Sequence, residues 1–187
     1  MNVMSAPPVL ASEVLDFWFE EHGPKDWFAK NPEFDAKIRS LFGALHARAA
    51  RGELDDWIET PKGALALILV LDQFSRNLHR DSARAFACDP KALEIARRVV
   101  EKGFHNGLAE RERVFVFVPF EHSEDRRDQE LSVGYFASLA DKSYLEWAEK
   151  HKAIIERFGR YPHRNAALGR KSTPEEIAFL AGPGSSF

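Results

Sequence analysis

The sequence has a single cysteine, Cys88, among its 187 residues. One thiol cannot close an internal disulfide and supplies no Cys-x-x-Cys metal pair, so disulfide-stapled domains and cysteine zinc sites are excluded. Scarce cysteine also suits a reducing compartment. Because Cys88 lies in RAFACDP among small and aromatic residues, we expect a small buried side chain rather than a nucleophile, which requires a neighbouring histidine and a lowered pKa.

A surplus of positive charge is also missing. The 26 Lys and Arg residues are outnumbered by 29 Asp and Glu residues, which gives a formal net charge of -3. Proteins that bind nucleic acid without sequence preference neutralise phosphates with such a surplus. We therefore expect no nucleic-acid partner.

Long apolar runs are absent as well. The longest is ALALILVL, over residues 64–71, which is far shorter than the roughly 20 residues that a membrane span needs. The first ten residues, MNVMSAPPVL, lack the basic start and apolar core of a signal peptide. We therefore expect a soluble, cytoplasmic protein with no membrane partner.

Apolar and aromatic side chains are abundant. Hydrophobic residues make up 44% of the chain, and its 15 Phe and four Trp are enough to dominate a sizeable core. No long Pro-, Gly- or Ser-rich stretch divides the chain, and the linkers are short, as between antiparallel helices. We expect one domain over residues 1–187, with loose tails at residues 1–8 and 182–187.

Helix signals recur along the whole chain. The segments NPEF and DPKA are typical helix starts, with Asn31 and Asp89 as N-caps before proline, and Thr173 forms a capping box with Glu176. Glycines are placed to end three of the helices, at Gly52, Gly103 and Gly159. The pattern predicts an all-α fold of about seven to nine helices that pack as antiparallel hairpins.

Two segments also have strand character. Residues 64–71 are apolar on nearly every side, which favours a fully buried central helix, with a buried strand as the competing interpretation. In RERVFVFVPFEHSED the Val/Phe alternation is typical of a strand, whereas the charged start and the helical surroundings favour a helix. For this segment we predict a helix that breaks or kinks at Pro119.

Polar residues follow the buried run, in LDQFSRN. Asp72 and Arg76 are four residues apart on one helical face and can form an ion pair. One interpretation is a structural pair that fixes the packing of the helix. The other is a polar cleft, lined by Asp72, Gln73, Arg76 and Asn77, at the place where the helix emerges from the core.

The densest acidic segment is PFEHSEDRRDQE, which includes Glu121, His122 and Glu124. A histidine between carboxylates can act as a general base while one carboxylate orients its ring. Such groups also bind metals, but the segment has no recognised ligand spacing, so we predict no metal. The competing structural interpretation is that Ser123 is a helix N-cap followed by acids in the first turn.

The segment RFGRYPHRNAALGR, residues 157–170, carries four arginines and no acid. Because a glycine ends the preceding helix and Pro162 favours an extended residue before it, we expect a loop from Arg160 to Arg170. Its arginines either clasp the protein's own carboxylates or leave one or two guanidinium groups for an anionic ligand. Nearby, His151 falls on an apolar helix face, where a satisfied core histidine is the simplest interpretation.

Four segments together resemble one family: LALILVLDQFSRN, RAFACDP, PFEHSE and ERFGRYPHRNAALGRKSTPEE. They are similar to the bacterial family known as domain of unknown function 924, and the resemblance extends from VLDFWF to FLAG, nearly the whole chain. The resemblance implies an all-α fold of the tetratricopeptide-like superhelical type, and it brings no established activity, cofactor or catalytic residue. The proline usual in LDQFPRN is Ser75 here, and the polar residues around it are in place.

The interpretation that joins these segments is a non-enzymatic binding module with a polar cleft. It would bind a small anionic ligand or an acidic peptide without a cofactor, with Arg160 and Arg164 holding the anion. The expected lining residues are Asp72, Gln73, Arg76, Asn77, His151, Arg160, His163, Arg164 and Asn165.

Two alternatives stay open. A hydrolase would use His122 or His163 as general base, with Glu121 or Glu124 as the acid or the orienting group. No nucleophile elbow, P-loop or dinucleotide motif demands an enzyme. A scaffold would instead use every polar cluster as an internal clasp. The aromatic content is also compatible with a homodimer, to which the sequence assigns no surface.

Overall fold

The most apolar segment of the chain forms a long buried helix. In the computed structural model, which describes residues 10–185, α4 (Pro61–Ile68) continues through a π-helical turn (Leu69–Gln73) into α5 (Phe74–Leu78). All residues from 63 to 75 of this helix are buried. The prediction of a central helix is confirmed, and the competing strand interpretation is wrong.

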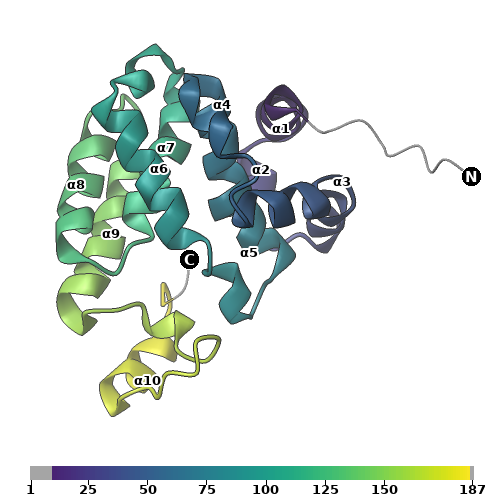
Figure 1. Ribbon diagram of the computed structural model, residues 1–187. Helices are drawn as coiled ribbons and strands as arrows, with labels where there is room; N and C mark the ends of the chain where they lie inside the picture. Colours follow the sequence, from purple (N-terminus) through teal and green to yellow (C-terminus); the bar gives the residue numbers. More distant parts are fainter. Residues whose placement is uncertain (1–9, 186–187) are drawn as a thin grey trace, which may run out of the picture.

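With α4 and α5 counted as one continuous helix, the described residues form nine α-helices and no strand, which confirms the predicted all-α fold (Figure 1). The other helices are α1 (Ala11–Asp16, continued by a π-helical turn over Phe17–Glu21), α2 (Pro24–Trp27), α3 (Pro32–Ala50), α6 (Asp89–Glu101), α7 (Glu110–Glu121), α8 (Arg126–Ala137), α9 (Ser143–Phe158) and α10 (Pro174–Leu180). None of the helices within residues 10–185 combines the length and the apolar character needed to cross a bilayer. The tetratricopeptide-like arrangement stays a prediction.

Most helix ends follow the sequence signals. Asn31 accepts hydrogen bonds from two amides in the first turn of α3, and Thr173 forms the predicted capping box with Glu176. The three predicted glycines, Gly52, Gly103 and Gly159, have φ angles of 84°, 69° and 71°. This left-handed backbone favours glycine and allows the chain to leave each helix.

Two cap predictions are wrong. Asp89 is the first helical residue of α6 and Cys88, which is half-buried, is its N-cap. The carboxylate of Asp89 instead accepts hydrogen bonds from Arg76 and Arg164. Similarly, Asp125 rather than Ser123 caps α8, because the Ser123 hydroxyl donates to Asp128 at 2.7 Å.

Helix α7 passes through Pro119 and ends two residues later, at Glu121. The predicted helix is therefore confirmed, but the predicted break at Pro119 is wrong. Proline removes one backbone donor, which weakens the last turn of a helix. Phe117 and Phe120, on either side of Pro119, are each 1% exposed, so core packing holds this last turn in place.

One continuous apolar core extends from α1 to α9. At its centre the ring of Trp18, which is fully buried, lies 5.5 to 5.9 Å from the rings of Trp27, Phe34, Phe74 and Phe115. Successive helices from α6 to α9 pack against one another (Figure 1). The aromatic side chains expected from the composition therefore do dominate the core.

A smaller apolar cluster joins the last turns of α9 to the chain that follows it. Tyr161 packs there with Ile154 and Ile155, and Phe179 of α10 contacts its edge. Helix α10 lies beyond the end of α9 (Figure 1). Of the predicted loose tails, residues 1–8 lie outside the described part of the chain, as do residues 186–187.

Candidate functional site

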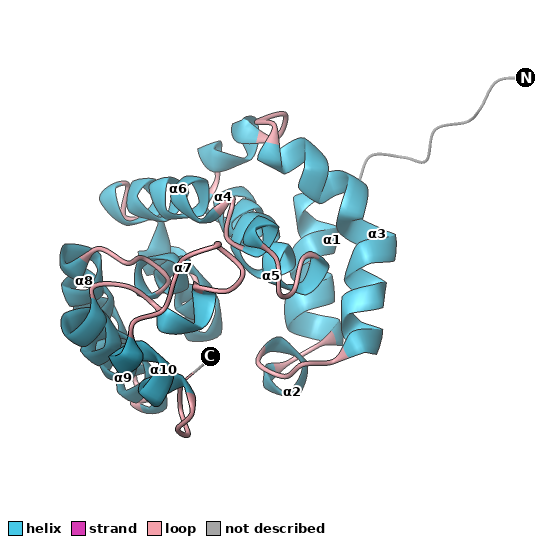
Figure 2. Ribbon diagram, turned by 90° about the horizontal axis from the view of Figure 1, so that it is seen from below, coloured by secondary structure: helices cyan, strands magenta, loops and turns pink. Residues whose placement is uncertain are grey.

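Ionic groups from four separate segments meet near the C-terminal half of the central helix. Asp72 and Arg76 come from that helix, Asp89 from the first turn of α6, His122 directly after α7, and Arg164 from the 3-10 turn after α9. We call these five residues the Arg76–Arg164 cluster. Figure 2 shows several loop segments gathered in this part of the molecule, between α5 and α10.

Asp72 is the most deeply buried member of the cluster, with 1% of its surface exposed. Its carboxylate accepts a hydrogen bond from the Gln73 side chain at 2.7 Å and lies 3.4 Å from Arg76 Nη1, which confirms the predicted pair. Burial raises the pKa of Asp72, but the charge of Arg76 and the hydrogen bonds from His122 and Gln73 outweigh it and hold this pKa below its ordinary value. The carboxylate is therefore ionised.

His122 is held in one orientation by this buried carboxylate. Its Nδ1 lies 2.7 Å from Asp72 Oδ1, and an ionised carboxylate can only accept, so Nδ1 carries the hydrogen. Burial and the charge of Arg76 lower the pKa of His122, against the opposing effect of Asp72. The ring is therefore neutral near pH 7, and its Nε2 is a hydrogen-bond acceptor.

Arg76 and Arg164 share one carboxylate and one aromatic ring. Arg76 binds both oxygens of Asp89, at 2.9 and 3.1 Å, whereas Arg164 reaches the same carboxylate only at 3.4 Å. Their guanidinium groups lie 5.5 and 4.7 Å from the Phe86 ring centre. Arg164 also lies 4.7 Å from the Tyr161 ring, and its Nε has no hydrogen-bond partner among the described residues.

The other three arginines of residues 157–170 bind the protein's own carboxylates. Two of these contacts are bidentate, with two guanidinium nitrogens on two carboxylate oxygens. The pairs are Arg157 with Glu175, Arg160 with Glu176 and Arg170 with Glu124, at closest distances of 2.9, 2.7 and 2.7 Å. They form a clasp that ties the end of α9 and the segment after it to α10 and to the loop after α7.

Three of the expected lining residues are engaged elsewhere. Arg160 belongs to the clasp, and so does Asn165, whose side chain accepts a hydrogen bond from Arg170 at 2.9 Å. Asn77 donates to Asp35 of α3 at 2.8 Å. The structure therefore does not bring these three residues together with the Arg76–Arg164 cluster.

His151 and His163 lie close to the Arg76–Arg164 cluster. Burial, followed by the charges of Arg164 and His151, lowers the pKa of His163 to about 3. His151 is buried, and its Nδ1 lies 2.8 Å from the Trp147 carbonyl oxygen and 3.1 Å from Glu121 Oε1. This environment agrees with the interpretation of His151 as a buried core histidine whose ring has hydrogen-bond partners.

Sequence reasoning missed Phe86, Asp89 and Tyr161 as neighbours of Arg164. The Tyr161 hydroxyl donates to the Glu121 carbonyl at 2.5 Å and accepts from Gln129 at 2.9 Å, and burial raises the Tyr161 pKa. The aromatic residue of RAFACDP and the tyrosine before Pro162 were visible in the sequence. The contacts of Phe86 and Asp89 with Arg164 were not, because they join segments that are about 75 residues apart, whereas Tyr161 lies only three residues before Arg164.

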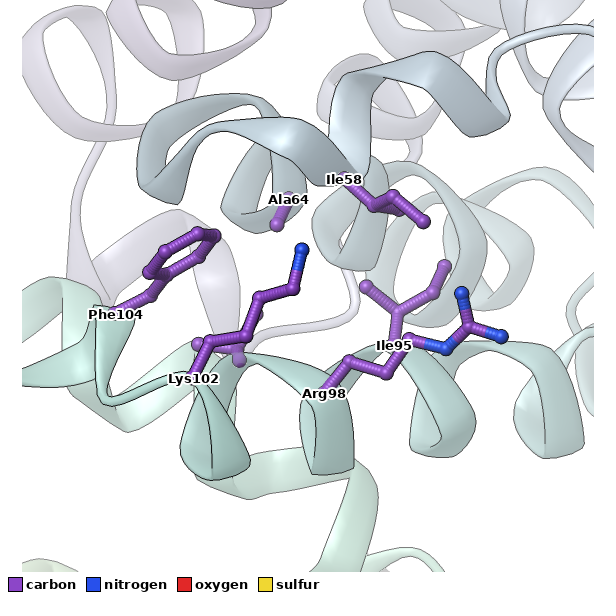
Figure 3. Close-up of a pocket in the computed structure, with 7 residues that line it drawn as sticks. Ile58, Ala64, Ile95, Arg98, Lys102 and Phe104 are labelled. Atoms are coloured by element: carbon purple, nitrogen blue, oxygen red, sulfur yellow. The ribbon is translucent and has the colours of Figure 1, made fainter.

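Two cavities lie away from this cluster. One, of about 10 Å³, is lined by residues that include Ile58, Ala64, Lys102 and Phe104, and it has room for a single water molecule (Figure 3). The other, of about 320 Å³, lies beside α1, where Lys62 and Glu112 form an ion pair at 2.5 Å. Within residues 10–185, no group of three His, Cys, Asp or Glu side chains could hold a metal ion.

A family model of bacterial proteins of unknown function, DUF924, matches residues 14–184. The chain belongs to this family. A solved structure of a protein of unknown function from Agrobacterium tumefaciens is 42% identical to this DUF924 protein, with a TM-score of 0.87. The match covers 91% of this chain and 96% of that one. A comparison with curated proteins finds no match.

In this DUF924 protein Ser75 is fully buried in the first turn of α5. The hydroxyl donates to the Leu71 carbonyl at 2.5 Å and lies 2.7 Å from His46 Nε2. Because the serine hydrogen is used by Leu71, His46 donates from Nε2. Burial, followed by the charges of His79 and Arg84, lowers the His46 pKa to about 4.

The buried histidines predict that this DUF924 protein loses stability in mild acid. His46, His122 and His163 all have folded-state pKa values below the ordinary value of 6.5. Below pH 6.5 the unfolded chain binds more protons than the folded one, so their contribution is complete above that pH and declines as pH falls toward 4. We expect calorimetry to give a level Tm between pH 7 and 8 and a fall of several degrees by pH 5. His46→Gln should reduce the fall, and a Tm that stays level down to pH 5 would contradict the assignment.

Proposed function

We propose that this DUF924 protein is a binding module that takes a small anionic ligand, or the acidic end of a peptide, at the Arg76–Arg164 cluster. The observation that carries the proposal is the state of Arg164. Arg164 is 6% exposed, its guanidinium lies 4.7 Å from the ring centres of both Phe86 and Tyr161, and it has one long contact to Asp89. A guanidinium has five N–H donors, and most of those of Arg164 are left for a further acceptor.

The electrostatics of the cluster support an anion. Burial and the neighbouring charge of Arg76 lower the pKa of Arg164, against the opposing effect of Asp89. The positive charge of Arg164 is thus poorly compensated where it lies. The planar guanidinium of Arg164 lies over two aromatic rings, and its fork of N–H donors suits carboxylate or phosphate oxygens.

The scaffold alternative accounts for only part of the arginine segment. Arg157, Arg160 and Arg170 each have a carboxylate at hydrogen-bonding distance and need no ligand. Arg164 differs from them, because the closer bonds to its shared carboxylate belong to Arg76. The segment therefore combines a clasp with one under-used guanidinium.

Thermal unfolding with added anions tests the proposal. The wild type, Arg164→Lys and Arg170→Lys are heated with and without millimolar succinate or phosphate, at constant ionic strength. Lysine keeps the charge but loses the planar fork. Because a ligand that binds only the folded state raises the Tm, we expect a shift of several degrees for the wild type and for Arg170→Lys, and none for Arg164→Lys. An equal shift in all three, or none in the wild type, would refute anion binding at Arg164.

A hydrolase is the second candidate, and the contact between Asp72 and His122 favours it. A buried carboxylate that orients a neutral histidine leaves Nε2 free to take a proton from water or a hydroxyl group. The test is turnover of small carboxylic and phosphoric esters by the wild type and by His122→Asn. Turnover that His122→Asn abolishes would establish the enzyme, and no turnover by the wild type above a buffer blank would count against it.

A further inference from the structure

The carboxylate of Asp89 occupies the position between Arg76 and Arg164 that a bound anion would take. It is the first residue of α6, but its side chain makes no cap hydrogen bond and instead lies between two arginines. The side chain is 16% exposed, compared with 1% for the Asp72 side chain. Of the two carboxylates in the cluster, Asp89 is therefore the one with a path to solvent.

Although the charge of Arg164 is poorly compensated where it lies, the charges of the cluster as a whole balance. Arg76 and Arg164 carry two positive charges, Asp72 and Asp89 carry two negative charges, and His122 is neutral. An anion that entered beside both carboxylates would leave a buried excess of negative charge, which is costly. One carboxylate must leave when a ligand enters, and Asp72 is fixed by Gln73, Arg76 and His122.

We infer that the ligand of the Arg76–Arg164 cluster is a carboxylate, and that it binds by displacing the side chain of Asp89 from both Arg76 and Arg164. This inference rests on the proposed function and names the chemistry of its ligand. The place that Asp89 holds is suited to one planar group with a single charge, bound by two guanidinium edges. A phosphate dianion would bring one charge more than the group it replaces.

Isothermal titration of Asp89→Asn tests the displacement. The variant keeps the shape of the side chain and removes the competing charge. Asp56→Asn is the matched control, because Asp56 is exposed and loses the same charge outside the cluster. The probes are acetate, succinate and inorganic phosphate, titrated into the wild type and both variants at constant ionic strength.

We expect Asp89→Asn to bind acetate and succinate at least about tenfold more tightly than the wild type. In the variant no competing carboxylate occupies the guanidinium groups of Arg76 and Arg164, so the binding-competent state is more populated. Asp56→Asn should match the wild type, and phosphate should gain less than the carboxylates. Asp89→Ser, with a residue that is favoured near helix starts, replaces the first variant if Asp89→Asn melts below the assay temperature.

Each outcome bears on a different claim. Equal succinate affinity in the wild type and Asp89→Asn overturns the displacement and leaves the proposed function standing. Binding by Asp89→Asn alone means that these probes do not displace Asp89 from the wild-type protein, which overturns both the displacement and the proposed function for these anions. A larger gain for phosphate than for succinate overturns the carboxylate assignment, and no binding by any variant overturns both the inference and the proposed function.

Discussion

Asp72→Ala is expected to lower the free energy of unfolding by about 3–5 kcal/mol, the range for a buried ion pair that loses one partner. Asp72 is 1% exposed, and its removal leaves His122, Gln73 and Arg76 with donors that turn toward an empty space. Urea unfolding of the wild type and the variant gives the difference directly.

Asp55→Ala provides the control for this prediction. Asp55 also has a basic partner, Lys91, at 2.6 Å, but its side chain is 56% exposed. Because water screens such a pair, we expect a change of no more than about 1 kcal/mol. A loss for Asp72→Ala as small as that of Asp55→Ala would mean that the cluster contributes little to the fold.

Gly63→Ala is expected to destabilise the protein by about 3 kcal/mol, at the upper end of the usual cost of overpacking. A Cβ at Gly63 would lie 2.3 Å from the Trp57 carbonyl oxygen and 2.8 Å from Thr60 Oγ1. The first of these atoms is backbone and cannot rotate away. The start of the central helix would have to shift from the turn that precedes it.

Gly43→Ala should have the opposite sign. Gly43 lies inside α3, and a Cβ there would meet nothing within 4 Å. Because alanine is favoured over glycine in a helix interior, we expect a gain of about 0.5–1 kcal/mol in urea unfolding. If both glycine variants changed stability in the same direction, the close approach at Gly63 would not be the cause of its loss.

The helices were largely predictable because their signals are local. Periodic apolar residues, N-caps and left-handed glycines act within one or two turns, so a sequence displays them directly. The ion pair between Asp72 and Arg76 was predictable for the same reason, since it spans four residues. The π-helical turn over Leu69–Gln73 was not predictable from the sequence. Asp72 lies within this turn, so the turn affects the direction in which the Asp72 side chain points.

The candidate site was predictable only in part, because its decisive contacts are long-range. Asp72 and His122 were each expected at a polar site, but nothing in the sequence pairs residues that are 50 positions apart. Asp89 was taken for a helix cap, which is the commonest local use of Asp before proline. Only the three-dimensional structure shows that the Asp89 carboxylate pairs with Arg76 and Arg164.

The central claim is that Arg164 has hydrogen-bond donors to offer to an anion, and proton–nitrogen NMR of the arginine Nε–H groups tests it most directly. Arg164→Lys assigns the Arg164 signal by its disappearance, and succinate is then titrated into the wild-type protein. We predict a large shift of that signal with saturation, while the signals of Arg160 and Arg170, whose Nε atoms already donate to Glu176 and Asn165, stay in place. An Arg164 signal that does not move as succinate is added would contradict the claim and leave the arginines of this segment as a purely internal clasp.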